Sequence, residues 1–260
     1  MDPMMAGWNA DNAAGPTGQG AVTLVEGSSF CISLQNGDIF PHHPHGVFHQ
    51  DTRILSRWTL SINGQPLEPL GAWTPSPYQG TYIGRAVRED GRADSPLTVE
   101  RKRQLGAGIL EDITIHNYAL EPARCDVALS VDADFADLFE VKDGRFHRQW
   151  NQTRRFENDS VRMEAAWQNV RKGVTVRAPG GEASADGLLF RAVVPAHGEW
   201  SVRATVAPVL DDADLASPPP PRPSRYRLTA GKAAAVLGCE HPSRPDWEPF
   251  PAANRLAQLR

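Results

Sequence analysis

The stretch ILSRWTLSING, residues 54–64, decides the fold class. From Arg57 to Ile62 polar and apolar residues alternate, as they do in a strand with one buried face. The strand runs into Asn63-Gly64, a dipeptide suited to a two-residue type I′ hairpin because both residues tolerate a positive φ. An alternating strand that ends in a tight reversal predicts antiparallel β-structure.

Similar strand-like stretches recur from residue 21 to about residue 210. They cover residues 22–25, 30–34, 54–62, 81–87, 97–105, 109–118, 126–135, 161–167, 174–176, 188–194 and 200–206. Four more Asx-Gly pairs separate or border them: Asn36-Gly37, Asp90-Gly91, Asp143-Gly144 and Asp186-Gly187. We expect hairpin reversals at these pairs. No helical period of ten or more residues separates the strands, so a parallel sheet with crossover helices is disfavoured.

We therefore predict an all-β protein built as a large antiparallel β-sandwich of the supersandwich kind. Residues 1–20 are predicted to be a flexible leader and residues 21–212 the sandwich. Residues 213–225 are predicted to be a proline-rich linker, and residues 226–260 the start of a following region with short helices at 230–237 and 254–260.

Composition limits the function classes. The 260 residues carry a formal net charge of −4, so the chain as a whole does not attract nucleic acid or anionic lipid. No apolar run approaches the roughly 20 residues of a membrane-spanning helix. We expect a soluble, cytoplasmic protein with no nucleic-acid or membrane partner. The three cysteines, Cys31, Cys125 and Cys239, are too widely spaced for a disulfide framework or a thiolate zinc site, and we expect free thiols.

Signatures of common catalytic sites are missing from the sequence. It contains no GxxxxGK[ST], no GxGxxG after a strand, no GxSxG and no HExxH. A glycosidase needs two carboxyl groups about 5–10 Å apart, and the sequence alone identifies no such pair. We assign no catalytic residue and no cofactor.

A histidine cluster is the most conspicuous local feature. Four of the eight histidines, His42, His43, His45 and His49, lie close together. Imidazoles at this density can bind Zn²⁺ or Ni²⁺ if the backbone turns them toward one point. Two interspersed prolines favour an extended or turning path, and the spacing matches no structural zinc pattern. We favour a solvated loop and keep metal binding as the weaker alternative.

Two pairs of residues are candidate sugar contacts. Asp51 and Arg53 share one face of an extended segment, where they can contact sugar hydroxyls or form an ion pair that orders a loop. Trp73 and Tyr78 lie in the proline-rich segment 73–78, which we interpret as a loop whose rings are free to stack on a sugar.

Other charged clusters are interpreted as solvated surface. Asp132, Asp134, Asp137 and Glu140 interleave with apolar residues; alternation puts the first two on the solvent side of a strand, and we favour a solvated face over a calcium site. The basic residues Arg101, Lys102, Arg103, Arg145, Arg148, Arg154 and Arg155 are likewise expected to be exposed.

Several segments together resemble the N-terminal domain of bacterial glycogen-debranching-enzyme-like proteins, the amylo-α-1,6-glucosidase group. The longest are VTLVEGSSFCISLQNGDI (22–39), HGVFHQDTRILSRWTLSINGQPLEPL (45–70) and VDADFADLFEVKDGR (131–145). Partial matches at 110–122 and 195–210 follow in the same order. The most specific motifs are DTRxLS at 51–56 and DFADLFEVK at 134–142.

The resemblance implies a β-sandwich placed ahead of an (α/α)₆ barrel that carries the hydrolytic carboxylates. Nothing in the 260 residues has the pattern of that barrel. The implied role is a non-catalytic accessory domain that packs on the barrel and shapes an α-glucan groove, with Asp51, Arg53, Trp73 and Tyr78 on the groove side. His42 and His43 depart from the family pattern, in which small residues and glycine are usual at this point.

Three other functions remain open from the sequence. The chain can be a stand-alone carbohydrate-binding module, an enzyme in its own right, or a metal-binding protein that uses the histidine cluster. Glucan binding, glucose release or metal binding by the isolated chain would respectively support them.

Overall fold

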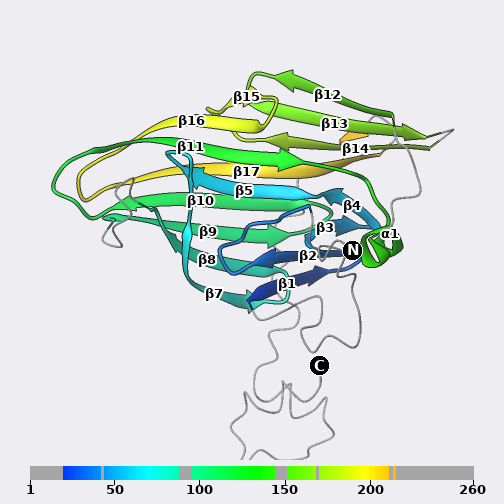
Figure 1. The fold of residues 1–260 in the computed structure, drawn as a ribbon, viewed down its shortest axis with the longest axis horizontal. Coiled ribbons are helices and arrows are strands. Elements are labelled where there is room, and N and C mark those ends of the chain that lie inside the picture. Colours follow the sequence, from blue (N-terminus) through cyan, green and yellow to red (C-terminus); the bar gives the residue numbers. More distant parts are fainter. Residues whose placement is uncertain are drawn as a thin grey trace, which may run out of the picture. The chain divides into compact units, whose positions relative to one another are not determined.

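The computed structural model describes residues 20–41, 44–87, 95–144, 151–167, 170–210 and 213–214. These residues form antiparallel sheets and one short helix (Figure 1), which confirms the predicted all-β class. Residues 1–19 of the predicted leader, the predicted C-terminal helices and nearly all of the linker lie outside the described residues. No helix within the described ranges is long and apolar enough to cross a membrane.

The strands form three sheets, and every pairing between strands is antiparallel. The four-stranded sheet has the order β1 (Ala21–Glu26), β2 (Ser29–Leu34), β3 (Gly46–His49) and β4 (Thr52–Leu55). The five-stranded sheet has the order β15 (Glu182–Ser184), β16 (Gly187–Val194), β11 (Ala123–Asp132), β5 (Arg57–Ile62) and β6 (Gln65–Pro66). The large sheet has the order β12 (Asn151–Glu157), β13 (Ser160–Trp167), β14 (Val170–Arg177), β17 (Glu199–Leu210), β10 (Ile109–Asn117), β9 (Leu97–Leu105), β8 (Gln79–Arg85) and β7 (Glu68–Ser76), with β18 (Ala213–Asp214) beside β17.

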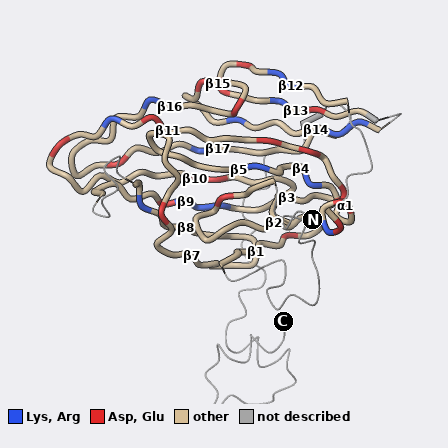
Figure 2. The backbone as a smooth tube through the Cα atoms, in the orientation of Figure 1, with Lys and Arg blue, Asp and Glu red and all other residues tan. Residues whose placement is uncertain are grey.

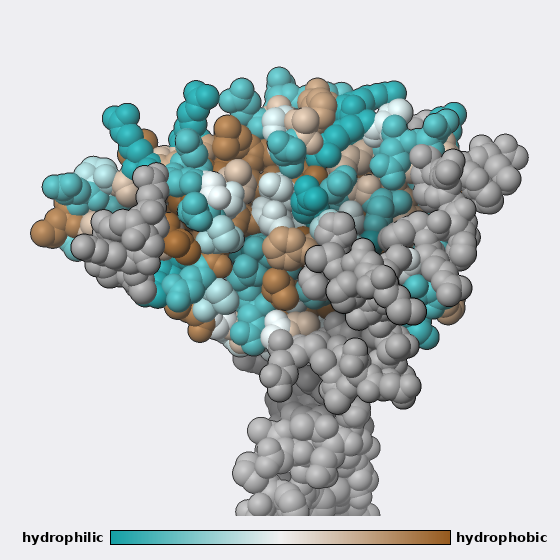
Figure 3. Space-filling model, viewed as in Figure 1, coloured by the Kyte–Doolittle hydropathy of each residue, from teal (hydrophilic) through white to brown (hydrophobic). Residues whose placement is uncertain are grey.

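One hydrophobic core joins the inner faces of the three sheets. It includes Leu24 of β1, Trp58 of β5 and Ile113 of β10, each at most 1% exposed. Trp58, Leu60 and Ile62 all point into this core, as the alternation in residues 57–62 predicted. On the surface, hydrophobic and hydrophilic residues are interspersed (Figure 3).

The Asx-Gly pairs make different turns from one another. Asn63 and Gly64 have φ values of 51° and 75°, and Ile62 pairs with Gln65, so the predicted two-residue type I′ hairpin is confirmed there. Asp143-Gly144 is not a hairpin, because Gly144 instead terminates the helix α1 (Leu138–Asp143) in the left-handed conformation. The hairpin between β15 and β16 turns at residues 185–186, one position before the predicted pair. Asp90-Gly91 lies outside the described residues.

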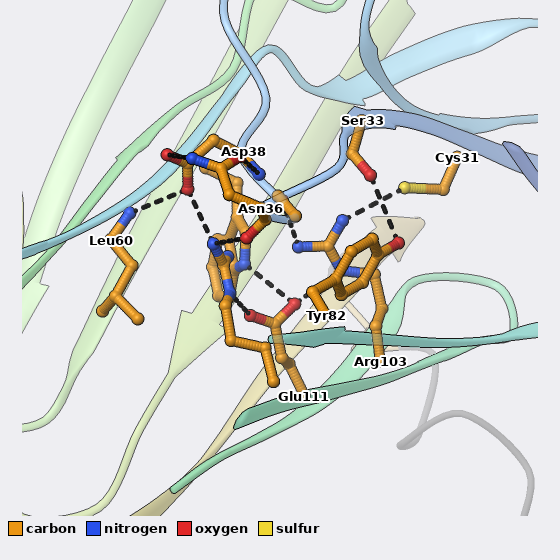
Figure 4. Close-up of polar contacts among 11 residues, drawn as sticks. Cys31, Ser33, Asn36, Asp38, Leu60, Tyr82, Arg103 and Glu111 are labelled. Atoms are coloured by element: carbon orange, nitrogen blue, oxygen red, sulfur yellow. Dashed lines mark hydrogen bonds and ion pairs between the residues drawn. The ribbon is translucent and has the colours of Figure 1, made fainter. Parts of the chain in front are cut away.

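A cluster of buried charges occupies the centre of the core (Figure 4). Arg101 and Arg103 of β9 are each 1% exposed, so the interpretation of these two arginines as surface residues was wrong. Both guanidinium groups contact the carboxylate of Glu111 in β10, which is fully buried; the Nε–Oε distances are 2.7 Å from Arg101 and 2.5 Å from Arg103. The reason is alternation: Lys102, between the two arginines, points the other way and is 59% exposed.

The cluster connects all three sheets. Trp58 of the five-stranded sheet donates its indole N–H to Glu111 (3.2 Å). The turn that follows β2 of the four-stranded sheet supplies Asp38, which pairs with Arg101 at 2.6 Å, and the carbonyl of Gly37, which accepts from Arg103 at 2.6 Å. Asp38 also accepts from the Leu60 backbone N–H (3.1 Å). One carboxylate on the large sheet therefore fixes how the other two sheets lie against it.

Electrostatics keeps Glu111 ionised in this dry position. Burial by itself raises the pKa of Glu111. The attraction of Arg101 and Arg103 lowers it by a larger amount, so the pKa lies below its ordinary value. The same attraction raises the pKa of Arg103 against the opposing effect of burial. The nearby Cys31 and the more distant Cys125 are buried free thiols, as expected, and burial raises the pKa of both.

We predict that Glu111→Gln lowers the free energy of unfolding by about 3–5 kcal/mol, because it leaves two buried guanidinium groups without a carboxylate. Urea unfolding followed by circular dichroism measures this. Because the native pKa of Glu111 is depressed, its contribution is present above the ordinary value of 4.5 and is lost as the pH falls through the native pKa. The difference in the free energy of unfolding between variant and parent should therefore shrink only as the pH falls below 4.5.

The adjacent Asp112→Asn is the matched control. Asp112 is one residue away but lies on the opposite face, in an exposed pair with Arg203, so we expect a change below about 1 kcal/mol. Equal effects of the two substitutions would show that the buried cluster does not hold the sheets together.

Candidate functional site

The two most specific sequence motifs meet at one place, which we call the motif corner: residues 50–53 together with residues 134–139. The backbone N–H of Arg53 donates to the carbonyl of Ala136 (2.8 Å), and that of Leu138 donates to the carbonyl of Asp51 (2.9 Å). Thr52 and Asp137 form an isolated β-bridge. Segments some 80 residues apart in the sequence are thus joined by backbone hydrogen bonds, and α1 lies beside β3 and β4 (Figure 1).

Arg53 is the centre of the motif corner. Its side chain is 1% exposed and forms a two-point ion pair with Asp134 through Nε (3.1 Å) and Nη2. It also donates to the carbonyl of His45 (3.2 Å). Gly46 lets it lie close to the backbone, since a Cβ there would stand 2.6 Å from the Arg53 Cδ. The neighbouring side chains of Gln50 and Asp51, by contrast, are exposed to solvent.

The backbone of the motif corner is strained. Gln50, Asp51 and Phe135 have φ values of 46°, 63° and 55°, although none is glycine. Such conformations cost roughly 1–3 kcal/mol each and persist where the surrounding structure over-determines them, often at functional sites. Here the Gln50 N–H donates to the Ser28 carbonyl at 3.1 Å, and the Phe135 side chain is fully buried.

A capping box fixes the first turn of helix α1, where the motif corner ends. The Asp137 side chain accepts from the N–H groups of Phe139 and Glu140, both at 2.9 Å, and Glu140 accepts from the Asp137 N–H at 3.0 Å, forming a capping box. The helix therefore holds Phe139 in one place, although that side chain is 69% exposed.

Asp132 is the last residue of β11 and is partly exposed, but the interpretation of Asp134 as part of the same strand face was wrong, because β11 ends at Asp132. Asp134, Asp137 and Glu140 lie beyond the strand, and each has a structural partner in the motif corner. Within the described ranges, no group of three or more His, Cys, Asp and Glu residues could hold a metal ion.

A shallow hollow of about 610 Å³ lies on the large sheet, on strands β12 to β14 and β17. Its polar lining comes from Asn151, Gln152, Thr153, Arg155, Glu164, Arg171 and Lys172. Lys172 connects the hollow to the motif corner, because its Nζ donates to the Thr52 hydroxyl at 2.8 Å. None of the described lining residues is aromatic, so the hollow offers no stacking platform.

The two candidate aromatic residues have different surroundings. Segment 73–76 is not a loop but the end of strand β7, and the chain reverses at residues 77–78 before Gln79 pairs with Ser76. Trp73 is 51% exposed on this strand. Tyr78 is partly buried and packs against the hydrophobic core. Of the two rings, Trp73 is the more accessible to a ligand.

The histidine cluster is only partly described. His42 and His43 lie outside the described residues, so a four-histidine metal site stays a prediction. His45 is 5% exposed. His49 lies 2.8 Å from the Ser29 hydroxyl through Nδ1, and burial lowers the pKa of His49 below its ordinary value.

One known protein family matches most of this chain. A family model described as the N-terminal domain of (some) glycogen debranching enzymes matches residues 24–205, well over half of the chain. The chain belongs to this family. The match includes both halves of the motif corner, so the features described above are features of a glycogen debranching enzyme N-terminal domain.

Other comparisons add only distant likenesses. No curated protein matches the chain. Among solved structures, a polysaccharide lyase has 11% sequence identity and a TM-score of 0.34, over 73% of this chain and 32% of the lyase. A galactose mutarotase related enzyme from Lactobacillus acidophilus has 8% identity and a TM-score of 0.36, over 72% of this chain and 97% of the enzyme. The chain thus spans about a third of the length of the lyase.

Sequence reasoning found Arg53 but missed its partner. Asp134 is 81 residues away, and no local pattern connects the two. Helix α1 was also missed, although Asp137 followed three residues later by Glu140 is the sequence signature of a capping box. That signature could have shown where the strand ends.

We predict that Asp134→Ala lowers the free energy of unfolding by about 1.5–3 kcal/mol, because the buried Arg53 loses a charge-assisted hydrogen-bonding partner. Chemical unfolding measures the loss. Asp126→Asn, at an exposed position of β11, is the control and should change stability by less than about 0.5 kcal/mol. An Asp134→Ala protein as stable as the parent would show that the ion pair does not organise the motif corner.

Proposed function

We propose that this chain is the non-catalytic N-terminal accessory domain of a glycogen-debranching-type α-1,6-glucosidase. In this role it packs on an (α/α)₆-type catalytic domain and helps to shape or orient an α-glucan groove. Membership in the family of glycogen debranching enzyme N-terminal domains supports the class of enzyme and the class of substrate.

The observation that carries the proposal is the construction of the motif corner. Three strained residues, a two-point buried ion pair and a capped helix all serve to hold one small surface rigid. That surface presents Phe139, an aromatic side chain that is 69% exposed. A large apolar side chain that is held on a rigid element can serve as an anchor in a protein interface. We assign Phe139 to the contact with the catalytic domain.

The four candidate groove-side residues have different roles in the proposed function. Asp51, exposed beside Phe139 in the motif corner, can accept hydrogen bonds from sugar hydroxyls. Arg53 acts indirectly, because its buried guanidinium positions the loop that carries Asp51. Trp73 offers an accessible ring, and Tyr78 supports the turn beside it.

The chemistry of the core fits a supporting domain. The general acid of a glycosidase must be protonated near neutral pH. Glu111, the most buried carboxyl group in the described ranges, is held ionised by two arginines and has a lowered pKa. It is therefore unsuited to donate a proton to a glycosidic oxygen.

A reconstitution experiment tests the proposal. The chain alone should release no glucose from glycogen limit dextrin, and it should bind the catalytic domain of the same debranching system in analytical ultracentrifugation. Phe139→Asp should weaken that association at least about tenfold without changing the unfolding curve. Tyr118→Asp, at a 64% exposed aromatic position outside the motif corner, is the control and should bind like the parent.

Two outcomes contradict the proposal. Glucose release by the chain alone would make it an enzyme in its own right. Glucan binding without any association with a catalytic domain would instead favour a stand-alone carbohydrate-binding module, the alternative that the exposed Trp73 supports.

A further inference from the structure

A row of side chains crosses the outer face of the large sheet, and we call it the outer row. The strand registers place Trp73 opposite Thr81, Thr81 opposite Lys102, Lys102 opposite Asp112, and Asp112 opposite Arg203. Directly opposed residues in an antiparallel sheet point to the same face. Because Arg101, Arg103 and Glu111 face the core, the outer row faces away from it.

The outer row is long, and all of its residues except Thr81, which is buried, reach solvent. Its five residues lie on five adjacent strands, so it spans four spacings of about 4.8 Å, or roughly 19 Å in total. Trp73, Lys102 and Arg203 are 51%, 59% and 63% exposed. A strip of this length can contact several linked pyranose rings at once.

The outer row is also pre-organised. Trp73 lies on a hydrogen-bonded strand, next to the buried Thr81. At the other end, Arg203 binds both oxygens of Asp112, at 2.6 Å from Nε and 2.9 Å from Nη2. This fork leaves donors on the guanidinium and lone pairs on the carboxylate for a ligand.

Charge pairing on this face selects a neutral ligand. Lys102 pairs with Glu100, Arg203 with Asp112, and Arg85 with Glu68, each at 2.6 Å. Figure 2 shows basic and acidic residues interspersed along the strands. Where cations are matched by carboxylates in this way, the surface does not attract a polyphosphate, but its polar groups can still bond to hydroxyls.

We propose that the outer row binds an extended α-glucan chain. Trp73 stacks on the apolar face of one pyranose ring, while Asp112 accepts from and Arg203 donates to hydroxyls further along the chain. This inference rests on the proposed function, because membership in the debranching family supplies the α-glucan as the ligand class.

Isothermal titration of the 260-residue chain with maltoheptaose tests the proposal. The parent should bind, and Trp73→Ala should weaken binding about tenfold, the loss expected for one aromatic stacking contact. Arg203→Gln, at an exposed position that the core does not need, should weaken binding several-fold. Tyr118→Ala, which removes an equally exposed ring outside the row, should bind like the parent. Cellohexaose, with its β-linkage, should bind more weakly than maltoheptaose.

The proposal is overturned if the parent does not bind maltoheptaose, or if both Trp73→Ala and Arg203→Gln bind as the parent does. The unfolding curve of each variant shows whether it is folded, and Arg203→Gln carries the test if Trp73→Ala does not fold. Failure here leaves association with a catalytic domain through Phe139 unaffected, so the two proposals fail separately.

Discussion

A carboxylate in a dry protein interior must be met by cations. Glu111 is fully buried on β10, and Arg101 and Arg103 bring their own desolvation cost to the same point. Further donors of the two guanidinium groups find partners outside the large sheet, in Asp38 and the Gly37 carbonyl after β2. The need to satisfy one buried charge group thus dictates how the three sheets pack, in a way that non-directional apolar contacts alone would not.

The motif corner repeats this solution at the periphery. A buried arginine again meets a carboxylate from a distant segment, here Arg53 and Asp134, and it also donates to the backbone carbonyl of His45. The ion pair, the bridge between Thr52 and Asp137, and the capped helix hold three residues in left-handed conformations that they would otherwise avoid. Stability in this part of the molecule is used to hold a surface fixed, as the proposed association with a catalytic domain requires.

The two faces of the large sheet have different roles. On β9 and β10 the inward residues Arg101, Arg103 and Glu111 form the structural cluster, while the intervening Lys102 and Asp112 belong to the outer row. The same pair of strands therefore supplies both the charges that hold the sandwich together and the polar groups that we propose contact a glucan. Because the side-chain period of a strand is two, a shift of one residue in register would exchange these roles.

Local patterns in the chain were enough to predict the fold class and the family. Alternation in residues 57–62, the Asn63-Gly64 hairpin and the two specific motifs depend on local periodicity and on short patterns, and local physics is enough to interpret them. Local patterns also indicated that Trp73 and Asp51 were worth attention, both of which lie exposed.

Which charged residues are buried, and which segments meet, became clear only from the packing of the sheets. Arg101 and Arg103 have the same local pattern as surface residues, and Arg53 and Asp134 are 81 residues apart. The energy of an ion pair depends on its dielectric surroundings and on the distance to its partner, and both are set by the packing of sheets from distant parts of the chain. For that reason the sequence named Arg53 as important, but its burial and its partner emerged only from the fold.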